Sequence, residues 1–163
     1  MTIKNYTFYA ITISYENEDE IHMKLYKSAM VKKESKLNIK NINTTNIFTL
    51  VDLAISTSKI KNNINFTKNY DPSIPEFKLD ASSFIKTLNS VFEVFKNKNN
   101  VACSILLKIG EYIKIDNIKY SLISVEIVAN EESDFSSLNI KETNSFILTY
   151  DDTKVTIDLP LIL

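Results

Sequence analysis

The sequence predicts a mainly β (α+β) protein: an antiparallel β barrel or sandwich with one well-defined amphipathic helix packed on it. Three observations predict this class. Apolar and polar residues alternate in several runs near both ends of the chain, as they do in half-buried strands. Residues 80–98 instead place their apolar residues at helical spacing. Strands and helices do not alternate regularly along the chain, which argues against a parallel sheet.

The first strands are expected at residues 3–15 and 21–31, on either side of an acidic turn at 16–20. Both runs alternate with period two, and two such runs around a short polar turn are typical of an antiparallel hairpin. Further along, Ile47, Leu50, Val51 and Ala54 have helical spacing after Thr45 or Asn46, either of which could cap a helix. This predicts a second, short helix over about 46–56, although its β-branched residues argue for a strand. A strand is expected around residues 60–66.

The helix over residues 80–98 is predicted with Asp80 as its N-cap, since a carboxylate there can accept from the first-turn N–H groups. One apolar stripe runs along it and is expected to face the core: Phe84, Leu88, Val91, Phe92 and Phe95. After the helix, residues 101–109, 113–115 and 118–129 predict a three-stranded meander that turns at Gly110-Glu111 and Asp116-Asn117. A last hairpin is expected from 145–150 and 154–161.

The 163 residues, 44% of them apolar, are enough for a single domain over 1–163, in which the proline-containing segment 69–79 could be an internal connector. The scarce residue types exclude several kinds of site. Gly110 is the only glycine, so the chain has neither a P-loop nor a dinucleotide fingerprint. One histidine and one cysteine cannot form a four-ligand structural zinc site or an intramolecular disulfide. We therefore expect no catalytic residues, no cofactor and no metal.

Two weaker candidates for chemistry are interpreted as structural. A pairing of His22 with Cys103 would require an exposed thiol, whereas Cys103 lies within an apolar strand, where free cysteine is usually buried. Carboxylates gather at 18–20, at 131–134 and at Asp151-Asp152, all in expected turns or loops. Solvated turns are the simpler interpretation, because a calcium loop of the usual kind is not present.

A basic segment over residues 24–40 is the feature that best suggests a ligand. Residues 1–68 carry 10 Lys and 6 acidic residues, whereas residues 69–163 carry 9 Lys and 14 acidic residues. Lysines beside aromatic rings can follow a phosphate backbone while the rings stack on bases. The candidate nucleic-acid-binding residues are Lys24, Tyr26, Lys27, Lys32, Lys33, Lys36 and Lys40. The alternatives are a solvated face, or a charge asymmetry that organises self-association.

The run of residues 110–125 resembles a hairpin found in small barrel modules, including components of phage tails and head–tail connectors. With no catalytic constellation, a β-rich pattern and a charge asymmetry, we expect a non-enzymatic structural or assembly protein of a virus, mobile element or phage-like particle, acting through protein–protein contacts. The alternatives are a barrel that binds single-stranded nucleic acid through residues 24–40, and a small host-directed inhibitor that binds a protein partner.

Protein partners or self-association are expected, together with no membrane and no small-molecule substrate. The chain shows no secretory h-region and no long apolar run. We therefore expect it in the cytoplasm or assembled into a particle.

Overall fold

The computed structural model describes residues 10–17, 20–26, 42–58, 65–136, 138 and 146–163. By its backbone contacts the chain divides into two compact units, Met1–Glu34 and Ser35–Leu163. The predicted single domain stays a prediction, because such units are defined by contacts and not by independent folding. The predicted segments 3–9, 27–31 and 60–64 lie outside the described residues.

The first unit contains an antiparallel hairpin of β1 (Ala10–Asn17) and β2 (Glu20–Tyr26). The expected N-terminal hairpin is confirmed over these residues. Its register pairs Ile13 with Met23 at the middle of the ribbon.

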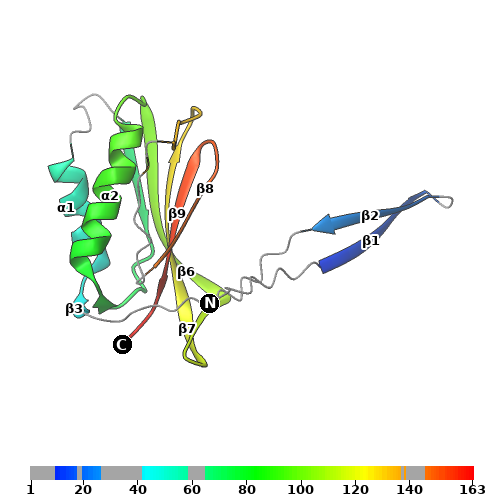
Figure 1. Cartoon of the computed structure of the whole chain (residues 1–163), viewed down its shortest axis with the longest axis horizontal. Helices are drawn as coiled ribbons and strands as arrows, with labels where there is room; N and C mark the ends of the chain where they lie inside the picture. Colours follow the sequence, from blue (N-terminus) through cyan, green and yellow to red (C-terminus); the bar gives the residue numbers. More distant parts are fainter. Residues whose placement is uncertain (1–9, 18–19, 27–41, 59–64, 137, 139–145) are drawn as a thin grey trace. The chain divides into compact units, whose positions relative to one another are not determined.

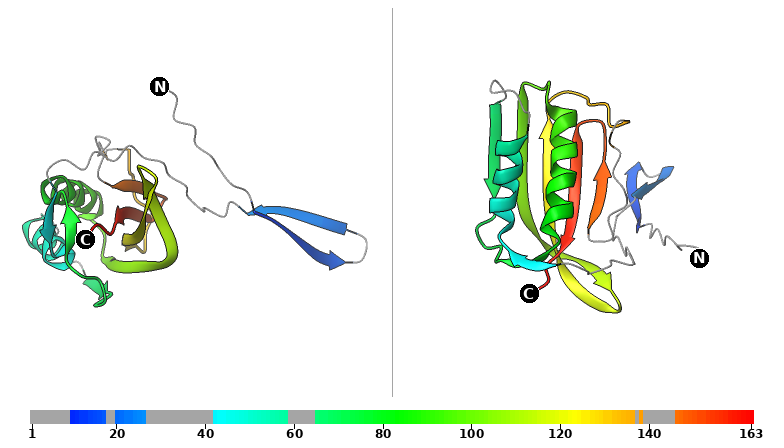
Figure 2. Two further views of the ribbon diagram at one scale, coloured as in Figure 1. Left: turned by 90° about the horizontal axis from the view of Figure 1, so that it is seen from below. Right: turned by 60° about the vertical axis from the view of Figure 1, so that its left-hand side comes forward.

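The second unit is an α/β sandwich of two layers (Figures 1 and 2). Its main sheet has five strands in the order β4-β6-β7-β9-β8. The bounds of these strands are Asn65–Tyr70 for β4, Asn100–Ile115 for β6, Ile118–Ala129 for β7, Ile147–Tyr150 for β8 and Lys154–Pro160 for β9. Two helices, α1 (Ile47–Thr57) and α2 (Ala81–Phe95), lie side by side on one face of this sheet. A separate antiparallel pair joins β3 (Asn43–Thr45) to β5 (Phe77–Leu79), and the sequence pattern predicted neither strand.

The sheet is open and mixed, so the predicted antiparallel barrel or sandwich is wrong. Strand β4 pairs with β6 in parallel, whereas the other neighbouring strands of the sheet are antiparallel. Parallel neighbours require a crossover connection, and α2 lies within the connection between β4 and β6. We expected a parallel sheet to need regular alternation along the whole chain. One strand–helix–strand unit is enough to make a mixed sheet, and periodicity alone does not show which strands pair.

Both predicted helices are present. Asn46 caps α1, its side-chain oxygen accepting from Thr49 N at 3.2 Å. Asp80 caps α2 as expected, because its carboxylate accepts from Ser83 N at 3.1 Å and from the Ser83 hydroxyl at 2.7 Å. The predicted stripe on α2 is fully buried at all five of its positions. Helix α2 therefore belongs to the core between the helices and the sheet, and it ends at Phe95 rather than at residue 98.

The predicted meander is a single hairpin in the structure. Strand β6 continues through Gly110, where we expected a turn, and its register against β7 shifts between Lys108 and Tyr112. This β-bulge accommodates Gly110, whose φ of 83° lies in the left-handed region. The expected turn at Asp116-Asn117 is confirmed, with φ values of 47° and 65°. Positive φ at both central residues is the mark of the two-residue turn that matches strand twist.

The last hairpin, β8 with β9, is also confirmed, and Pro160 is the final residue of β9, a position where proline is tolerated. Among the described residues, neither helix combines the length and the apolar character that a membrane crossing requires.

Candidate functional site

A polar cluster lies at the end of the second unit where α2 leads into β6. The Lys98 ammonium donates to the backbone oxygen of Glu132 and lies 3.9 Å from Glu131 Oε2. Asn99 Nδ2 donates to Glu131 Oε1 at 3.4 Å. These contacts hold the segment that follows β7 against the start of β6. They also leave the Lys98 side chain only 17% exposed.

The turn between β8 and β9 lies against the same segment. Ser133 N donates to the backbone oxygen of Asp152 at 2.7 Å. Within the turn, Asp151 Oδ1 accepts from Thr153 N at 3.0 Å and from Lys154 N at 2.9 Å. The hydrogen bond from Thr153 N is the main reason why the pKa of Asp151 lies below its ordinary value.

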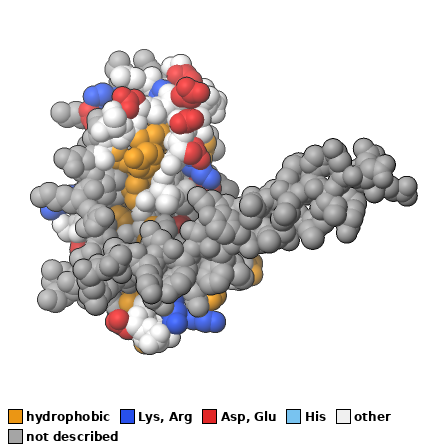
Figure 3. Space-filling model, turned by 45° about the vertical axis from the view of Figure 1, so that its right-hand side comes forward, with side chains coloured by type: hydrophobic (Ala, Val, Ile, Leu, Met, Phe, Trp, Pro, Cys, Tyr) orange, Lys and Arg blue, Asp and Glu red, His pale blue; other side chains and the backbone are white. Residues whose placement is uncertain are grey.

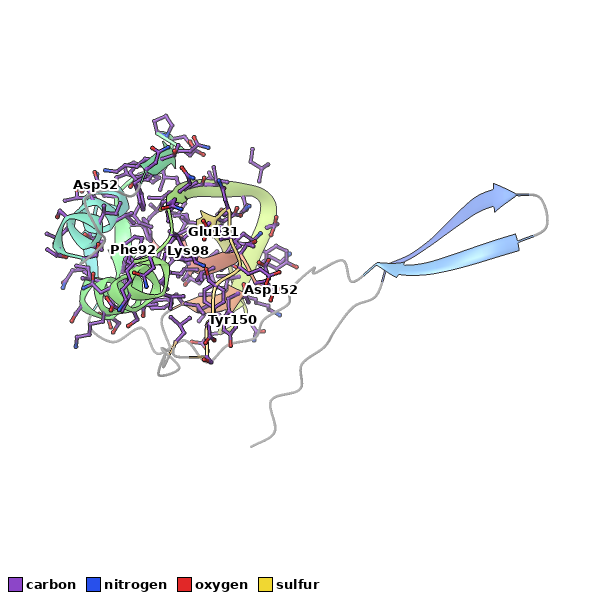
Figure 4. The ribbon with its side chains drawn as sticks, turned by 90° about the horizontal axis from the view of Figure 1, so that it is seen from above. Asp52, Phe92, Lys98, Glu131, Tyr150 and Asp152 are labelled. Carbon is purple, nitrogen blue, oxygen red and sulfur yellow. The ribbon has the colours of Figure 1, made fainter. Side chains whose placement is uncertain are left out.

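Acidic side chains gather at this end of the second unit (Figure 3). Lys98, Glu131, Tyr150 and Asp152 share one side of it in Figure 4, with Asp52 on the other side beside α1. We refer to the residues at this end as the Lys98 cluster: Lys98, Glu131, Glu132, Asp134, Asp151, Asp152, Phe135 and Tyr150.

Aromatic rings connect this cluster to the core. Phe95, fully buried at the end of α2, meets Phe135 edge to face with ring centroids 5.7 Å apart. The ring of Phe135 lies 5.1 Å from that of Tyr150, which is 57% exposed. An exposed aromatic ring supported in this way offers a surface on which a planar ligand could stack.

A second polar cluster fastens α1 to the edge of the sheet. Asp52 Oδ1 on α1 accepts from Lys68 Nζ at 2.8 Å and from the Tyr70 hydroxyl at 2.9 Å, both on β4. The Tyr70 ring stacks on Phe48 with centroids 5.4 Å apart. Burial is the main reason that the pKa of Tyr70 is raised, so the hydroxyl stays protonated and can donate to Asp52. We interpret this cluster as a structural fastening.

The chemistry open to the described residues is limited. No three of the described His, Cys, Asp and Glu residues are grouped in a way that could hold a metal ion. Cys103 is fully buried, as expected, and burial raises the pKa of its thiol to about 12. A thiol in that state is a poor nucleophile, which agrees with the structural interpretation of Cys103.

The structure describes only part of the predicted basic segment. Lys24 and Tyr26 lie in β2, where the register pairs them with Thr12 and Ala10 of β1. The other five candidates, Lys27, Lys32, Lys33, Lys36 and Lys40, lie outside the described residues. Their assignment as ligand-binding residues stays a prediction.

Sequence reasoning separated residues that the fold brings together. The acidic groups at 131–134 and 151–152 were treated as two independent turns, yet they meet because β7 and β9 are neighbours in the sheet. The pairing of β7 with β9 could have indicated this, but the strand order could not be derived from the pattern. Nothing in the sequence links Asp52 to Lys68, because their contact depends on the parallel placement of β4.

No family model and no curated protein matches the sequence. Solved structures of several histidine kinases are similar to it in fold. The chain is similar to the histidine kinase AdeS of Acinetobacter baumannii, with a TM-score of 0.52 and 8% identity, over 74% of this chain and 68% of that one. The catalytic domain of the histidine kinase ThkA gives a TM-score of 0.47 at 14% identity, over 74% and 96%. The mycobacterial sensor histidine kinase MprB gives 0.46 at 11% identity, over 74% and 99%.

The likeness to AdeS corrects the functional interpretation of the sequence. The prediction of a particle protein built on a barrel is wrong, because the open mixed sheet with its two helices is the fold of a histidine kinase. The resemblance of residues 110–125 to phage modules came from turn chemistry alone. The prediction that the chain is not an enzyme is overturned by the same finding, since the protein that shares the fold is a kinase. At this level of identity, what the comparison establishes for this chain is its fold, that of the histidine kinases.

Proposed function

We propose that this chain is an enzyme-like signalling domain built on the histidine kinase fold, which works in the cytoplasm and in contact with a protein partner. The observation that supports the proposal is the likeness of fold to AdeS over 74% of this chain. A kinase transfers a phosphoryl group from a nucleoside triphosphate. ATP is therefore the first ligand to test.

The Lys98 cluster is the part of the described chain that best suits such a ligand. It is built from three connections, 96–99, 130–134 and 151–153, and connections between rigid elements commonly carry binding residues. Lys98 supplies a cation that is mostly enclosed, and Tyr150 supplies an exposed ring. An ammonium suits a phosphate as a point charge, and an aromatic ring suits a nucleobase.

The sequence restricts how phosphates could be held. With Gly110 as the only glycine, no glycine-rich loop can bring backbone N–H groups around a phosphate chain. Glu131, Glu132, Asp134 and Asp152 also give the cluster an excess of negative charge. A bare triphosphate would be repelled by these carboxylates, so binding is expected to require a divalent cation that offsets the charge.

The direct test is the melting temperature of the full chain with ATP and with ADP, each with and without Mg²⁺. A ligand that binds the folded chain stabilises it by about 2.7 kcal/mol at a concentration about 100 times its Kd. That corresponds to a rise of several degrees for a chain of this size, on the order of 5 °C. Absence of a shift with every nucleotide, in the presence and absence of Mg²⁺, contradicts the proposal.

A matched pair of variants locates the site. Lys98→Ala should reduce the shift, because it removes the enclosed ammonium. Lys96→Ala should leave it unchanged, because the Lys96 side chain, just after α2, is 44% exposed and pairs with Glu93 in the last turn of that helix. Equal effects of the two variants would place any nucleotide away from the Lys98 cluster.

A further inference from the structure

The hairpin of β6 and β7 extends beyond the rest of the main sheet (Figure 1). Strand β4 pairs with β6 only as far as Ile105, and β9 pairs with β7 only from Leu122 onward. Residues 109–121, which include the turn, therefore form a two-stranded projection, which we call the hairpin tip. Strand β7 runs from the hairpin tip towards the Lys98 cluster, so the two lie at opposite ends of the sheet.

A small core of its own holds the hairpin tip in place. Ile113 and Ile115 are buried and pack with Leu122, and Ile147 of β8 packs against them. Successive residues of a strand point to opposite faces. Lys114, which lies between the two buried isoleucines, therefore points away from this core. The core thus fixes the direction of the opposite face of the tip.

That opposite face carries two lysines that face each other. The register pairs Lys114 directly with Lys119, whose ammonium lies 4.5 Å from the centre of the Tyr112 ring. Within the described chain neither lysine forms an ion pair, whereas Lys108 of the same hairpin donates to Glu126 Oε1 at 2.7 Å. Like charges directly opposite each other destabilise a strand pair. A negatively charged ligand would relieve this repulsion.

The two acidic residues of the hairpin tip do not neutralise these lysines. Glu111 lies where the register of β6 shifts, and Asp116 lies in the turn. Neither carboxylate forms an ion pair with Lys114 or Lys119. The lysine pair is therefore a local site of positive charge in a chain whose net charge is -1.

We propose that the hairpin tip binds an acidic segment of a protein partner, whose carboxylates lie against Lys114 and Lys119. Ile109 and Ile118 in the same tip are 95% and 56% exposed, and apolar residues beside charged ones are typical of protein interfaces. A nucleic acid fits less well, because base stacking needs a free ring and Lys119 already lies over Tyr112.

This inference rests on the partner contact in the proposed function, but it does not depend on nucleotide binding. The two can therefore fail separately. Lys114→Glu should keep any melting shift that ATP and Mg²⁺ produce, because the hairpin tip and the Lys98 cluster lie at opposite ends of β7. Absence of that shift in the original chain contradicts nucleotide binding and leaves the binding of acidic segments to be decided by its own measurement.

The measurement is fluorescence polarisation of a labelled peptide of eight glutamates, titrated with the full chain at low salt. Binding should weaken as salt is added, because exposed charges are screened. Lys114→Glu should raise the Kd about tenfold or more. The same variant should raise the melting temperature by about 1–3 °C, because an opposite-charge pair replaces the two facing lysines. A more stable chain that loses the peptide has not lost it by misfolding.

Lys86→Glu on the exposed side of α2 is the matched control, since it changes the net charge equally. It should leave the Kd within about twofold of the original chain. Absence of peptide binding by the original chain at low salt overturns the proposal. Equal weakening by Lys86→Glu also overturns it, because the attraction would then be general. Tighter binding of an oligothymidine of eight nucleotides, lost in Lys114→Glu, would assign the tip to nucleic acid and overturn it as well.

Discussion

Lys68 Nζ lies 2.8 Å from Asp52 Oδ1, and this ion pair joins α1 to β4, the edge strand of the main sheet. The Tyr70 hydroxyl donates to the same oxygen at 2.9 Å. Helix α1 and the edge strand are thus fastened by one carboxylate that accepts two hydrogen bonds. The hydrogen bond from Lys68 is the largest reason why the pKa of Asp52 is lowered.

Replacing this carboxylate should loosen the edge of the sheet. Because Asp52 and Lys68 are about half exposed, the ion pair itself contributes less than about 1 kcal/mol, and the Tyr70 hydrogen bond adds a similar amount. Asp52→Ala should therefore lower the free energy of unfolding by about 1 to 2 kcal/mol, measured by urea denaturation. Tyr70→Phe, which removes one of the two hydrogen bonds, should cost less than Asp52→Ala.

The contribution of Asp52 should depend on pH in a predictable direction. A carboxyl whose pKa is lower in the folded than in the unfolded chain adds stability above its unfolded pKa. This stability is lost as the pH falls through the folded pKa. The difference in stability between the original chain and Asp52→Asn should be constant near neutral pH and shrink below about pH 4. A difference that grows on acidification would contradict the assignment.

Phe92 is a test of the core between the helices and the sheet. It is fully buried, and its ring meets Phe66 of β4 edge to face at 6.0 Å. Phe92→Ala should cost about 3–5 kcal/mol and lower the melting temperature by at least about 6 °C. Lys86→Ala on the exposed side of α2 is the control and should change little. A shift below about 2 °C for Phe92→Ala would mean that the ring is not in the core.

The turn at Asp116-Asn117 permits a paired substitution. Asn117 has a φ of 65°, a conformation that asparagine and glycine tolerate and β-branched residues resist. Asn117→Gly should leave thermal stability unchanged or slightly raised. Asn117→Val should cost about 1–2 kcal/mol. Equal stability of the two variants would show that the turn has another conformation.

Cys103 should not react with alkylating reagents from solution while the chain is folded. Burial is the largest cause of its raised pKa of about 12, and Asp52 adds to the effect. Reaction with an alkylating reagent at mildly alkaline pH should occur only after denaturation, as followed by intact mass. Rapid labelling of the native chain would show that β6 is accessible there.

Local features of this fold follow from the sequence, whereas its global arrangement does not. The Asp80 cap, the buried stripe of α2 and the turn at Asp116-Asn117 each depend on residues close together in the chain. The bulge at Gly110 was mistaken for a turn, because one glycine between two alternating runs fits either structure. The parallel pairing of β4 with β6 depends on contacts across α2, which no local pattern encodes.

The candidate site likewise combines residues that the sequence identifies with an arrangement that it does not. The carboxylates of the Lys98 cluster are visible in the sequence, and their solvated loops were predicted. Their meeting with Lys98 depends on the order β6-β7-β9 within the sheet. Strand order is set by long-range packing, so a pattern that identifies each strand cannot by itself assemble the site.

The pairing of β4 with β6 distinguishes the open mixed sheet from the predicted barrel, and native Cys103 provides a direct test of its register. The register sets Lys68 opposite Cys103, so neighbouring strands bring the two Cα atoms close enough for a disulfide. Under a strong oxidant, Lys68→Cys should form an intramolecular disulfide, seen as a loss of two thiols in the intact chain. Asn69→Cys, whose partner is Ser104, should keep both thiols. A chain in which Lys68→Cys keeps both thiols while Asn69→Cys loses them would contradict the parallel register and the fold built on it.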